Sequence, residues 1–209
     1  MSTVIEINSW KRKSYYQFFS SFDEPFFGIT AQINCTAGYQ NAKKRGTSFF
    51  IYYLYKSLLA VNAIEELRTR IVDEQIILYD KVHASSTIGR SDNSFGYSFI
   101  EFEQEYSDFE KNAIAEIEFV RSVEGLNLNE NTGRIDTIHY SAIPWIKFNG
   151  LTHARNFKFK DSIPKLTFGK VTENGGEMVM PVSINLHHGL ADAYHAGKYF
   201  ELFEQFLNG

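Results

Sequence analysis

A pair of adjacent histidines near the end of the chain offers the clearest chemistry in the sequence. His187 and His188 close a strand-like run and are followed by Gly189 and a helical pattern. The reference pKa of histidine lies near neutrality, so a neutral imidazole can accept a proton at physiological pH. Held at the end of a strand and aimed at a bound hydroxyl, such a ring acts as a general base. His188 is a candidate for this role.

Two other interpretations of these histidines stay open on spacing alone. A histidine that is simply buried in the core is commoner than a catalytic one. The second interpretation is a metal site, because His188, Asp192 and His195 are spaced at i, i+4 and i+7, which zinc tolerates on one helix. No thiolate or further ligand cluster accompanies the three, so we expect no metal.

A strand and a helix must position the histidine pair. The strand is predicted over Met178–His188, because its apolar residues alternate and fall on one face together with His188. His188 is therefore expected to point inward. After Gly189 a helical apolar stripe predicts a helix that packs back on the sheet, with these members: Ala193, Ala196, Phe200, Phe203 and Leu207. The turn at 173–176 predicts a hairpin into the strand.

Earlier segments show the same two periodicities. The predicted helices are one capped by Asn8 and Ser9 that runs through Tyr16 and Phe19, one within Thr47–Leu67 and one over Ser107–Glu124. The predicted strands are Phe27–Thr36, Gln75–Tyr79 paired in a hairpin with Val82–Thr87, Ile138–Phe148 and Lys165–Val171.

The composition predicts one domain over residues 1–209. The formal charge of −4 excludes a general drive toward nucleic acid or anionic membranes. Cys35 is the only cysteine, so no intrachain disulfide forms. We find neither a signal peptide nor an apolar run of about 18 residues, and we expect a soluble cytoplasmic protein. The 19 Phe and 12 Tyr are compatible with a large core, with apolar pockets or with subunit interfaces, and these counts alone do not distinguish the three.

Four motifs, in order and in register over nearly the whole chain, match one known family. Its N-terminal WxRK corresponds to Trp10-Lys11-Arg12-Lys13, and its SAxPW to Ser141-Ala142-Ile143-Pro144-Trp145. Its TxGK corresponds to Thr167-Phe168-Gly169-Lys170, and the HxxxD core of its HHxxxDG signature to His188-Gly189-Leu190-Ala191-Asp192. The chain thus resembles the chloramphenicol acetyltransferase family.

The resemblance implies a role for each matched residue. His188 matches the catalytic base, and His187 its structural neighbour. Ser141 matches the serine that donates to the oxyanion of the tetrahedral intermediate, and Thr167 a threonine that holds an ordered water there. Arg12 and Asp192 match a buried ion pair that supports the His188 loop. Without the resemblance, each would pass as an ordinary turn, strand or surface residue.

The resemblance also implies the fold, the substrates and the assembly. The fold is α/β, a two-layer sandwich in which helices cover a mixed β-sheet. Acetyl-coenzyme A is a cosubstrate, no cofactor is bound permanently, and the acceptor is a small hydroxylated molecule. The family assembles as a homotrimer with active sites between subunits. Coenzyme A contacts are expected from Lys170 and from the basic run Lys43, Lys44 and Arg45. Such a run of charges is more often simply exposed to solvent.

The chain departs from the family pattern at three places. Ala193 replaces the glycine that follows the motif aspartate, which costs stability only where that glycine has a positive φ. Val171 replaces a tyrosine near coenzyme A. The acceptor region 22–29 differs in identity, so chloramphenicol itself is in doubt, and we expect Phe26, Phe27 and Phe95 to line the acceptor site.

Two rival functions follow from the same residues. The acyltransferase core of the 2-oxoacid dehydrogenase complexes shares an HxxxDG motif, and the absence of lipoyl and subunit-binding domains weighs against it. A catalytically idle sensor or binding protein on this fold is the rival from another class, and Ala193 and the diverged acceptor region favour it. Turnover of acetyl-coenzyme A with a panel of acceptors separates the two classes.

Overall fold

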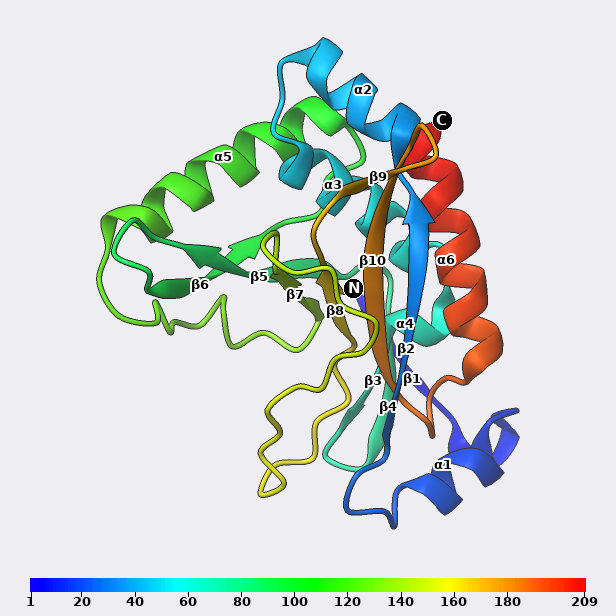
Figure 1. Ribbon diagram of the computed structural model, residues 1–209. Coiled ribbons are helices and arrows are strands. Elements are labelled where there is room, and N and C mark those ends of the chain that lie inside the picture. Colours follow the sequence, from blue (N-terminus) through cyan, green and yellow to red (C-terminus); the bar gives the residue numbers. More distant parts are fainter.

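The computed structural model describes residues 1–209, in which helices pack on one face of a large twisted sheet (Figure 1). The helices are a 3-10 turn η1 (Ile7–Ser9), α1 (Lys13–Phe19), α2 (Thr36–Arg45), α3 (Phe49–Asn62), α4 (Glu65–Arg68), α5 (Tyr106–Ser122) and α6 (Ala193–Asn208). The strands are β1 (Ser2–Ile5), β2 (Phe26–Asn34), β3 (Thr69–Val72), β4 (Gln75–Tyr79), β5 (His83–Gly89), β6 (Phe95–Ile100), β7 (Thr137–Ala142), β8 (Lys165–Phe168), β9 (Thr172–Asn174) and β10 (Glu177–His187).

The main sheet has the strand order β2-β10-β8-β7-β5-β6, and β9 pairs with β10 off this path. The pairs β5–β7 and β7–β8 are parallel, whereas the other pairs of this sheet are antiparallel. A smaller antiparallel sheet has the order β1-β4-β3. The predicted α/β fold, a mixed sheet covered by helices, is confirmed.

The long strand β10 has two different faces, as its alternating sequence predicts. Met180, Val182, Ile184 and Leu186 are at most 1% exposed and belong to one core cluster of 35 buried residues. Residues of α3 and α6 contribute to the same cluster, and α6 runs alongside β10 and β2 in Figure 1. The opposite face of β10 carries Ser183, Asn185 and His187, so the sheet has an apolar face toward the helices and a polar face away from them.

The hairpin before β10 forms where its turn residues predict it. Asn174 pairs with Glu177, so Gly175 and Gly176 make a two-residue loop. Their φ values of 61° and 86° lie in the left-handed region that glycine adopts without a Cβ clash. The predicted helix over 107–124 and the predicted strand over 27–36 are also confirmed, as α5 and β2.

The predicted hairpin of Gln75–Tyr79 with Val82–Thr87 is wrong. Strand β4 pairs with β1 and β3 in the small sheet, and β5 joins the main sheet between β6 and β7. Asn62 explains the break, because its side chain accepts from the N–H of Val82 at 2.8 Å and donates to the carbonyl of Val82 at 3.1 Å. The main-chain groups that would extend a hairpin are thereby occupied.

The first helix begins later than predicted. Ser9 and Asn8 belong to the 3-10 turn, where the Ser9 hydroxyl donates to the Glu6 carbonyl and Asn8 accepts from Lys13. Neither therefore caps α1, whose N-cap residue is Arg12. The guanidinium of Arg12 points instead to the other end of the chain.

Three further boundaries differ from prediction. The helix within 47–67 is interrupted between α3 and α4. The strand from Ile138 ends at Ala142, shortly before Pro144, which has no N–H to donate to a ladder. The strand from Lys165 ends at Phe168, and at Gly169 a Cβ would come within 2.5 Å of Pro181 Cγ, so only glycine fits this close approach. None of the helices combines the length and apolar character needed to cross a bilayer.

Candidate active site

His188 lies just beyond the last paired residue of β10, clamped between two phenylalanines. Its ring stacks on Phe19 of α1, with centroids 4.0 Å apart and planes 7° apart, and packs against Phe27 of β2 at 4.6 Å. Its N–H donates to the carbonyl of Pro25 at 2.8 Å. The residue is half-buried: Nδ1 is buried without a partner, whereas Nε2 makes no hydrogen bond in the chain and is accessible. The imidazole is therefore held in one orientation with Nε2 available to a substrate.

The neighbouring His187 has a different environment on the opposite face of β10. It is 5% exposed, and its Nδ1 accepts from the N–H of Gly189 at 3.1 Å. Burial lowers the pKa of His187 to about 4, so the ring is neutral at pH 7 with its proton on Nε2. Its ring also meets the edge of Phe26 at 5.6 Å. These contacts tie the turn after β10 to the sheet.

An ion pair joins the start of the chain to the turn after His188. Arg12 Nη1 donates to Asp192 Oδ2 at 2.9 Å, and Nη2 donates to the carbonyl of His188 at 3.2 Å. Asp192 also accepts from the N–H of Tyr194 and caps α6. Burial opposes ionisation of Asp192, but the hydrogen bond from Arg12 and the charges of His195 and Arg12 outweigh it and lower its pKa. Arg12 thus fixes the backbone of His188 directly.

Two of the three residues weighed as a zinc set, His195 and Asp192, bond to each other. His195 Nδ1 lies 2.9 Å from Asp192 Oδ1, and His195 Nε2 lies 3.2 Å from Glu66 Oε1. His188 is held between the phenylalanines. No cluster of three or more histidine, cysteine, aspartate or glutamate side chains has the geometry to hold a metal ion.

Ala193, in place of the motif glycine, is the first residue of α6. It is not among the residues with positive φ, so the backbone there suits any L-amino acid. An alanine in the first turn of a helix is neutral or favourable. This departure does not disturb the His188 turn.

Ser141 and Thr167 lie side by side on the polar face of the sheet. They are register partners in the parallel pair β7–β8, and Thr167 is in turn opposite Ser183 of β10. The preceding residue, Tyr140, points into the core, where its hydroxyl lies 3.0 Å from Ser57 Oγ, which also bonds Tyr199 at 2.8 Å. Because side chains alternate along a strand, this buried anchor turns Ser141 to the other face.

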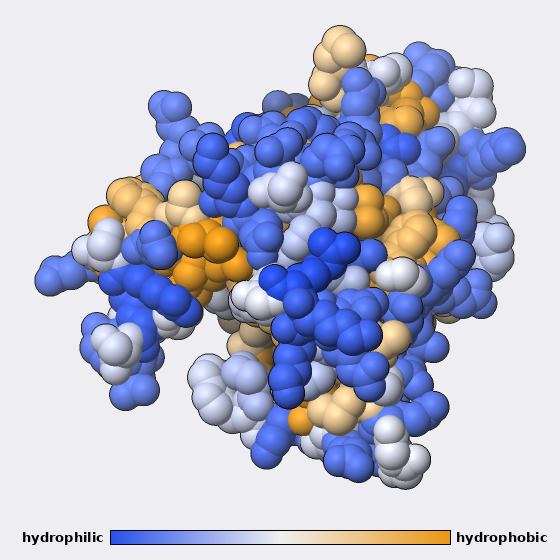
Figure 2. All heavy atoms as spheres, turned by 90° about the horizontal axis from the view of Figure 1, so that it is seen from above, coloured by the Kyte–Doolittle hydropathy of each residue, from blue (hydrophilic) through white to orange (hydrophobic).

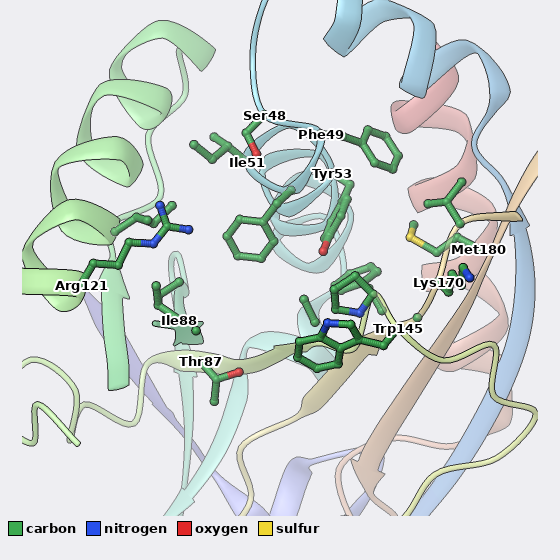
Figure 3. A pocket seen from close by; sticks show the side chains of 18 of the residues that line it. Ser48, Phe49, Ile51, Tyr53, Thr87, Ile88, Arg121, Trp145, Lys170 and Met180 are labelled. Carbon is green, nitrogen blue, oxygen red and sulfur yellow. The ribbon is translucent and has the colours of Figure 1, made fainter. Parts of the chain in front are cut away.

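Two cavities lie along the end of β7. The larger, of about 660 Å³, is mostly apolar and is surrounded by residues of α3, α5 and the chain after β7 and β8, as Figure 3 shows for Tyr53, Arg121 and Trp145. The smaller, of about 420 Å³, contains Ser141 in its wall. Ala142 lines the first cavity, and Thr87 lines both. The end of β7 therefore borders both cavities: Ala142 lines the mostly apolar one, and Ser141 lines the one with more polar residues in its wall.

The residues expected to contact coenzyme A divide into two groups. Lys170 and Val171 line the larger cavity, together with Arg121 from α5. The basic run Lys43, Lys44 and Arg45 does not line it; all three are exposed in the last turn of α2. That turn ends at Gly46, two residues before the cavity residue Ser48, so the run lies near the cavity.

The three phenylalanines expected to line the acceptor site lie outside both cavities. Phe27 contacts His188. The ring of Phe26 lies beneath the guanidinium of Arg155, whose Cζ is 3.5 Å from the ring centroid. Lys165 Nζ is 4.6 Å from the same centroid. Phe95 begins β6, is 45% exposed and packs on Tyr97, which does line the smaller cavity.

His188 and Ser141 do not meet within one chain. Ser183, the β10 residue in the same row as Ser141 and Thr167, precedes His188 by five positions. At a rise of about 3.3 Å per residue this places the histidine roughly 16 Å along the strand from that row. One chain therefore presents two candidate half-sites: the accessible imidazole of His188, and the Ser141 row with its cavities.

Several residues of these half-sites were not anticipated. Phe19 faces His188, and His139, His153 and Lys165 line the smaller cavity. The strand sequences do carry a signal for two of them: His139 and Lys165 alternate with the apolar residues of β7 and β8. His153 lies in an irregular segment where no periodicity indicates its direction.

We predict that Arg12 and Asp192 are energetically coupled. In a double-mutant cycle with Arg12→Ala and Asp192→Asn, which keeps a helix-capping side chain, the coupling should be about 1–3 kcal/mol at pH 7. The measurement is urea unfolding at fixed protein concentration. Because the pKa of Asp192 is lowered in the fold, the coupling is present above the unfolded pKa of about 3.9 and is lost as the pH falls through the folded value. Additive losses at pH 7 would contradict it.

Comparisons with known proteins agree with this geometry. A family model described as chloramphenicol acetyltransferase matches residues 1–204. The chloramphenicol acetyltransferase of Clostridium perfringens is 28% identical over 200 residues, which cover 94% of this chain and 90% of that protein. That of Campylobacter coli is 26% identical over 208 residues, which cover 99% of this chain and 98% of that protein.

Solved structures give the same result. A chloramphenicol acetyltransferase structure superposes with a TM-score of 0.92 at 31% identity and covers 99% of this chain and 100% of that chain. A probable dihydrolipoamide acetyltransferase from Listeria monocytogenes superposes with a TM-score of 0.66 over 93% of this chain and 88% of that chain; its 11% identity shows a shared fold alone. With the family model matching nearly the whole sequence, the chain belongs to the chloramphenicol acetyltransferase family and is an acyltransferase.

Proposed function

We propose that the protein transfers an acetyl group from acetyl-coenzyme A to a hydroxyl of a small molecule. The observation that carries this proposal is that the end of β7 borders two cavities, with Ala142 in the wall of one and Ser141 in the wall of the other. A transfer between two substrates needs both of them bound with their reacting atoms adjacent. We propose that the two cavities bordered by the end of β7 hold the two substrates in this way.

The larger cavity is the proposed site of acetyl-coenzyme A. Its apolar wall suits the slender thiol-bearing arm, and Lys170 and Arg121 bring positive charge to the same cavity. We propose that the exposed run Lys43, Lys44 and Arg45, which lies near Ser48, meets the phosphates outside it. Val171 supplies only apolar contact where the family has a tyrosine.

The base is proposed to come from a second copy of the chain. Because His188 lies far along β10 from Ser141, a complete site needs His188 of one subunit against the Ser141 row of another. The family's homotrimer meets this requirement. Large exposed apolar side chains suit subunit contacts; they include Phe18, Phe22, Leu128, Trp145, Phe157 and Phe159. Figure 2 shows separate apolar patches among hydrophilic side chains on the face seen from above.

The reaction then proceeds without a covalent enzyme intermediate. Nε2 of His188 takes the proton of the acceptor hydroxyl as its oxygen attacks the thioester carbonyl. The carbonyl oxygen becomes an oxyanion, to which the hydroxyl of Ser141 donates, and Thr167 holds a water beside it. When the intermediate collapses, the carbon–sulfur bond breaks and the thiolate of coenzyme A takes the proton back from Nε2. The ester and the free thiol are the products.

The catalytically idle sensor loses one of its two supports. That rival rested on Ala193 and on the diverged acceptor region. Since Ala193 begins α6 with ordinary helical backbone, it leaves the turn that holds His188 intact. The clamp on His188, with Nε2 accessible, is what a general base requires. We therefore retain the transferase.

Replacing His188 with alanine should reduce acetyl transfer at least about 10²-fold, because the general base is lost. Free-thiol release in the presence of acetyl-coenzyme A and a panel of hydroxylated acceptors, including chloramphenicol, measures it, and circular dichroism checks the fold. His187→Ala is the matched control: its buried ring supports the turn, so it should chiefly lower stability. If the His188→Ala variant turned over near the wild-type rate, His188 would not be the general base.

Replacing Ser141 with alanine should reduce kcat by roughly 10–10³-fold with little change in the affinity for acetyl-coenzyme A. The reason is that its hydrogen bond strengthens as negative charge develops on the carbonyl oxygen. Steady-state kinetics separates the two parameters. A variant with unchanged kcat and only a raised KM would move Ser141 to substrate positioning.

A further inference from the structure

Two rows of polar side chains on the sheet contribute residues to the wall of the smaller cavity. One row runs Ser85, His139, Lys165 and Asn185 across four neighbouring strands. The next row contains Ser141, Thr167 and Ser183. Of the eleven residues that line the cavity, four are hydrophobic; the others are Ser85, Thr87, Thr132, His139, Ser141, His153 and Lys165. Most of the residues that line this cavity therefore carry hydrogen-bonding groups that an acceptor can meet.

Two imidazoles in this wall are neutral at physiological pH. Burial, followed by the charge of Lys165, lowers the pKa of His139 to about 4. Burial, together with Lys165 and Arg155, also lowers the pKa of His153, whose Nε2 lies 3.5 Å from Thr167 Oγ1. A neutral imidazole has one N–H donor and one acceptor nitrogen. A substrate hydroxyl, which both donates and accepts, is the matching partner.

The formal charges around the cavity already have partners. Lys165 Nζ donates to Asp161 Oδ2 at 2.5 Å and to the carbonyl of Ile163 at 3.2 Å. Arg155 lies 3.5 Å from Glu24 and over the ring of Phe26. A charged acceptor would have to compete with these pairs, whereas a neutral one leaves them in place.

We propose that the acceptor is a neutral polyhydroxylated molecule about the size of a monosaccharide, selected by His139 and His153. The inference rests on the proposed transferase function and names the substrate class of the same site. Within one chain the cavity measures about 420 Å³, which accommodates a six-membered ring with its substituents. An acceptor without hydroxyls beside the reacting one leaves the His139 nitrogens, His153 Nδ1 and the Ser85 and Thr87 hydroxyls without partners, each at a cost of roughly tenfold or more in binding.

The test compares two neutral acceptors that share a primary hydroxyl on a six-membered ring. Methyl glucopyranoside carries further ring hydroxyls, and cyclohexylmethanol carries none. Calorimetry measures the binding of each to the native oligomer, and free-thiol release measures kcat/KM. We expect the glucoside to be favoured at least about 100-fold in both, because several stranded groups contribute. A carboxylate analogue, glucuronic acid, tests the preference for a neutral molecule and should bind more weakly.

Variants of the two histidines test their part in the selection. His139→Leu and His153→Leu should each reduce the ratio of kcat/KM for the glucoside to that for cyclohexylmethanol about tenfold or more. His139→Gln and His153→Gln keep a donor and an acceptor and should restore most of it. The ratio cancels any loss common to both acceptors, including one caused by the contact of His153 with Thr167.

Binding that is equal for the two acceptors, or tighter for cyclohexylmethanol or the glucuronate, overturns the inference. So does a ratio that the leucine variants leave unchanged. If the glucoside binds as expected but no acceptor in the panel releases thiol, the proposed transferase function fails while the assignment of this cavity to a polyol stands.

Discussion

The register of β10 is the constraint on which the rest of the site depends. Pairing on both edges, with β2 and β8, fixes which residues of this strand face the helices and which face away. It also fixes Ser183 beside Thr167 and carries His188 beyond the end of the ladder. A shift of one residue would exchange the apolar and polar faces and bury the wrong side chains, so the core itself maintains the register.

Two sets of contacts hold His188 at the end of this strand, one to its backbone and one to its ring. The backbone of His188 is held on one side by the carbonyl of Pro25 and on the other by Arg12. Its ring is held by Phe19 and Phe27. Arg12 and Phe19 come from the start of the chain, so the first and last elements must both be in place before the ring is oriented. The ion pair with Asp192 is therefore part of how the histidine is aimed.

Secondary structure could be predicted from the sequence where a regular hydrophobic pattern extends over many residues. The alternation of β10, the stripe of α6 and the glycine pair at 175–176 all predicted what forms, and the motifs predicted the family. Prediction failed where a distant side chain decides the outcome. Asn62 occupies the backbone of Val82 and prevents a local hairpin, and Arg12 turns to Asp192. The polar cavity depends on strand order, which brings His139 beside Lys165 and which no local pattern specifies.

The central claim is that His188 and Ser141 act together only across a subunit boundary. The most direct measurement is the activity of mixed oligomers assembled from His188→Ala and Ser141→Ala chains, each with its own affinity tag and purified through both tags. In such oligomers the Ser141→Ala chain supplies an intact His188 and the neighbouring His188→Ala chain supplies an intact Ser141, so one complete site forms. Free-thiol release should therefore rise well above that of either parent variant. Doubly purified mixed oligomers that remain as inactive as the parents would contradict the account.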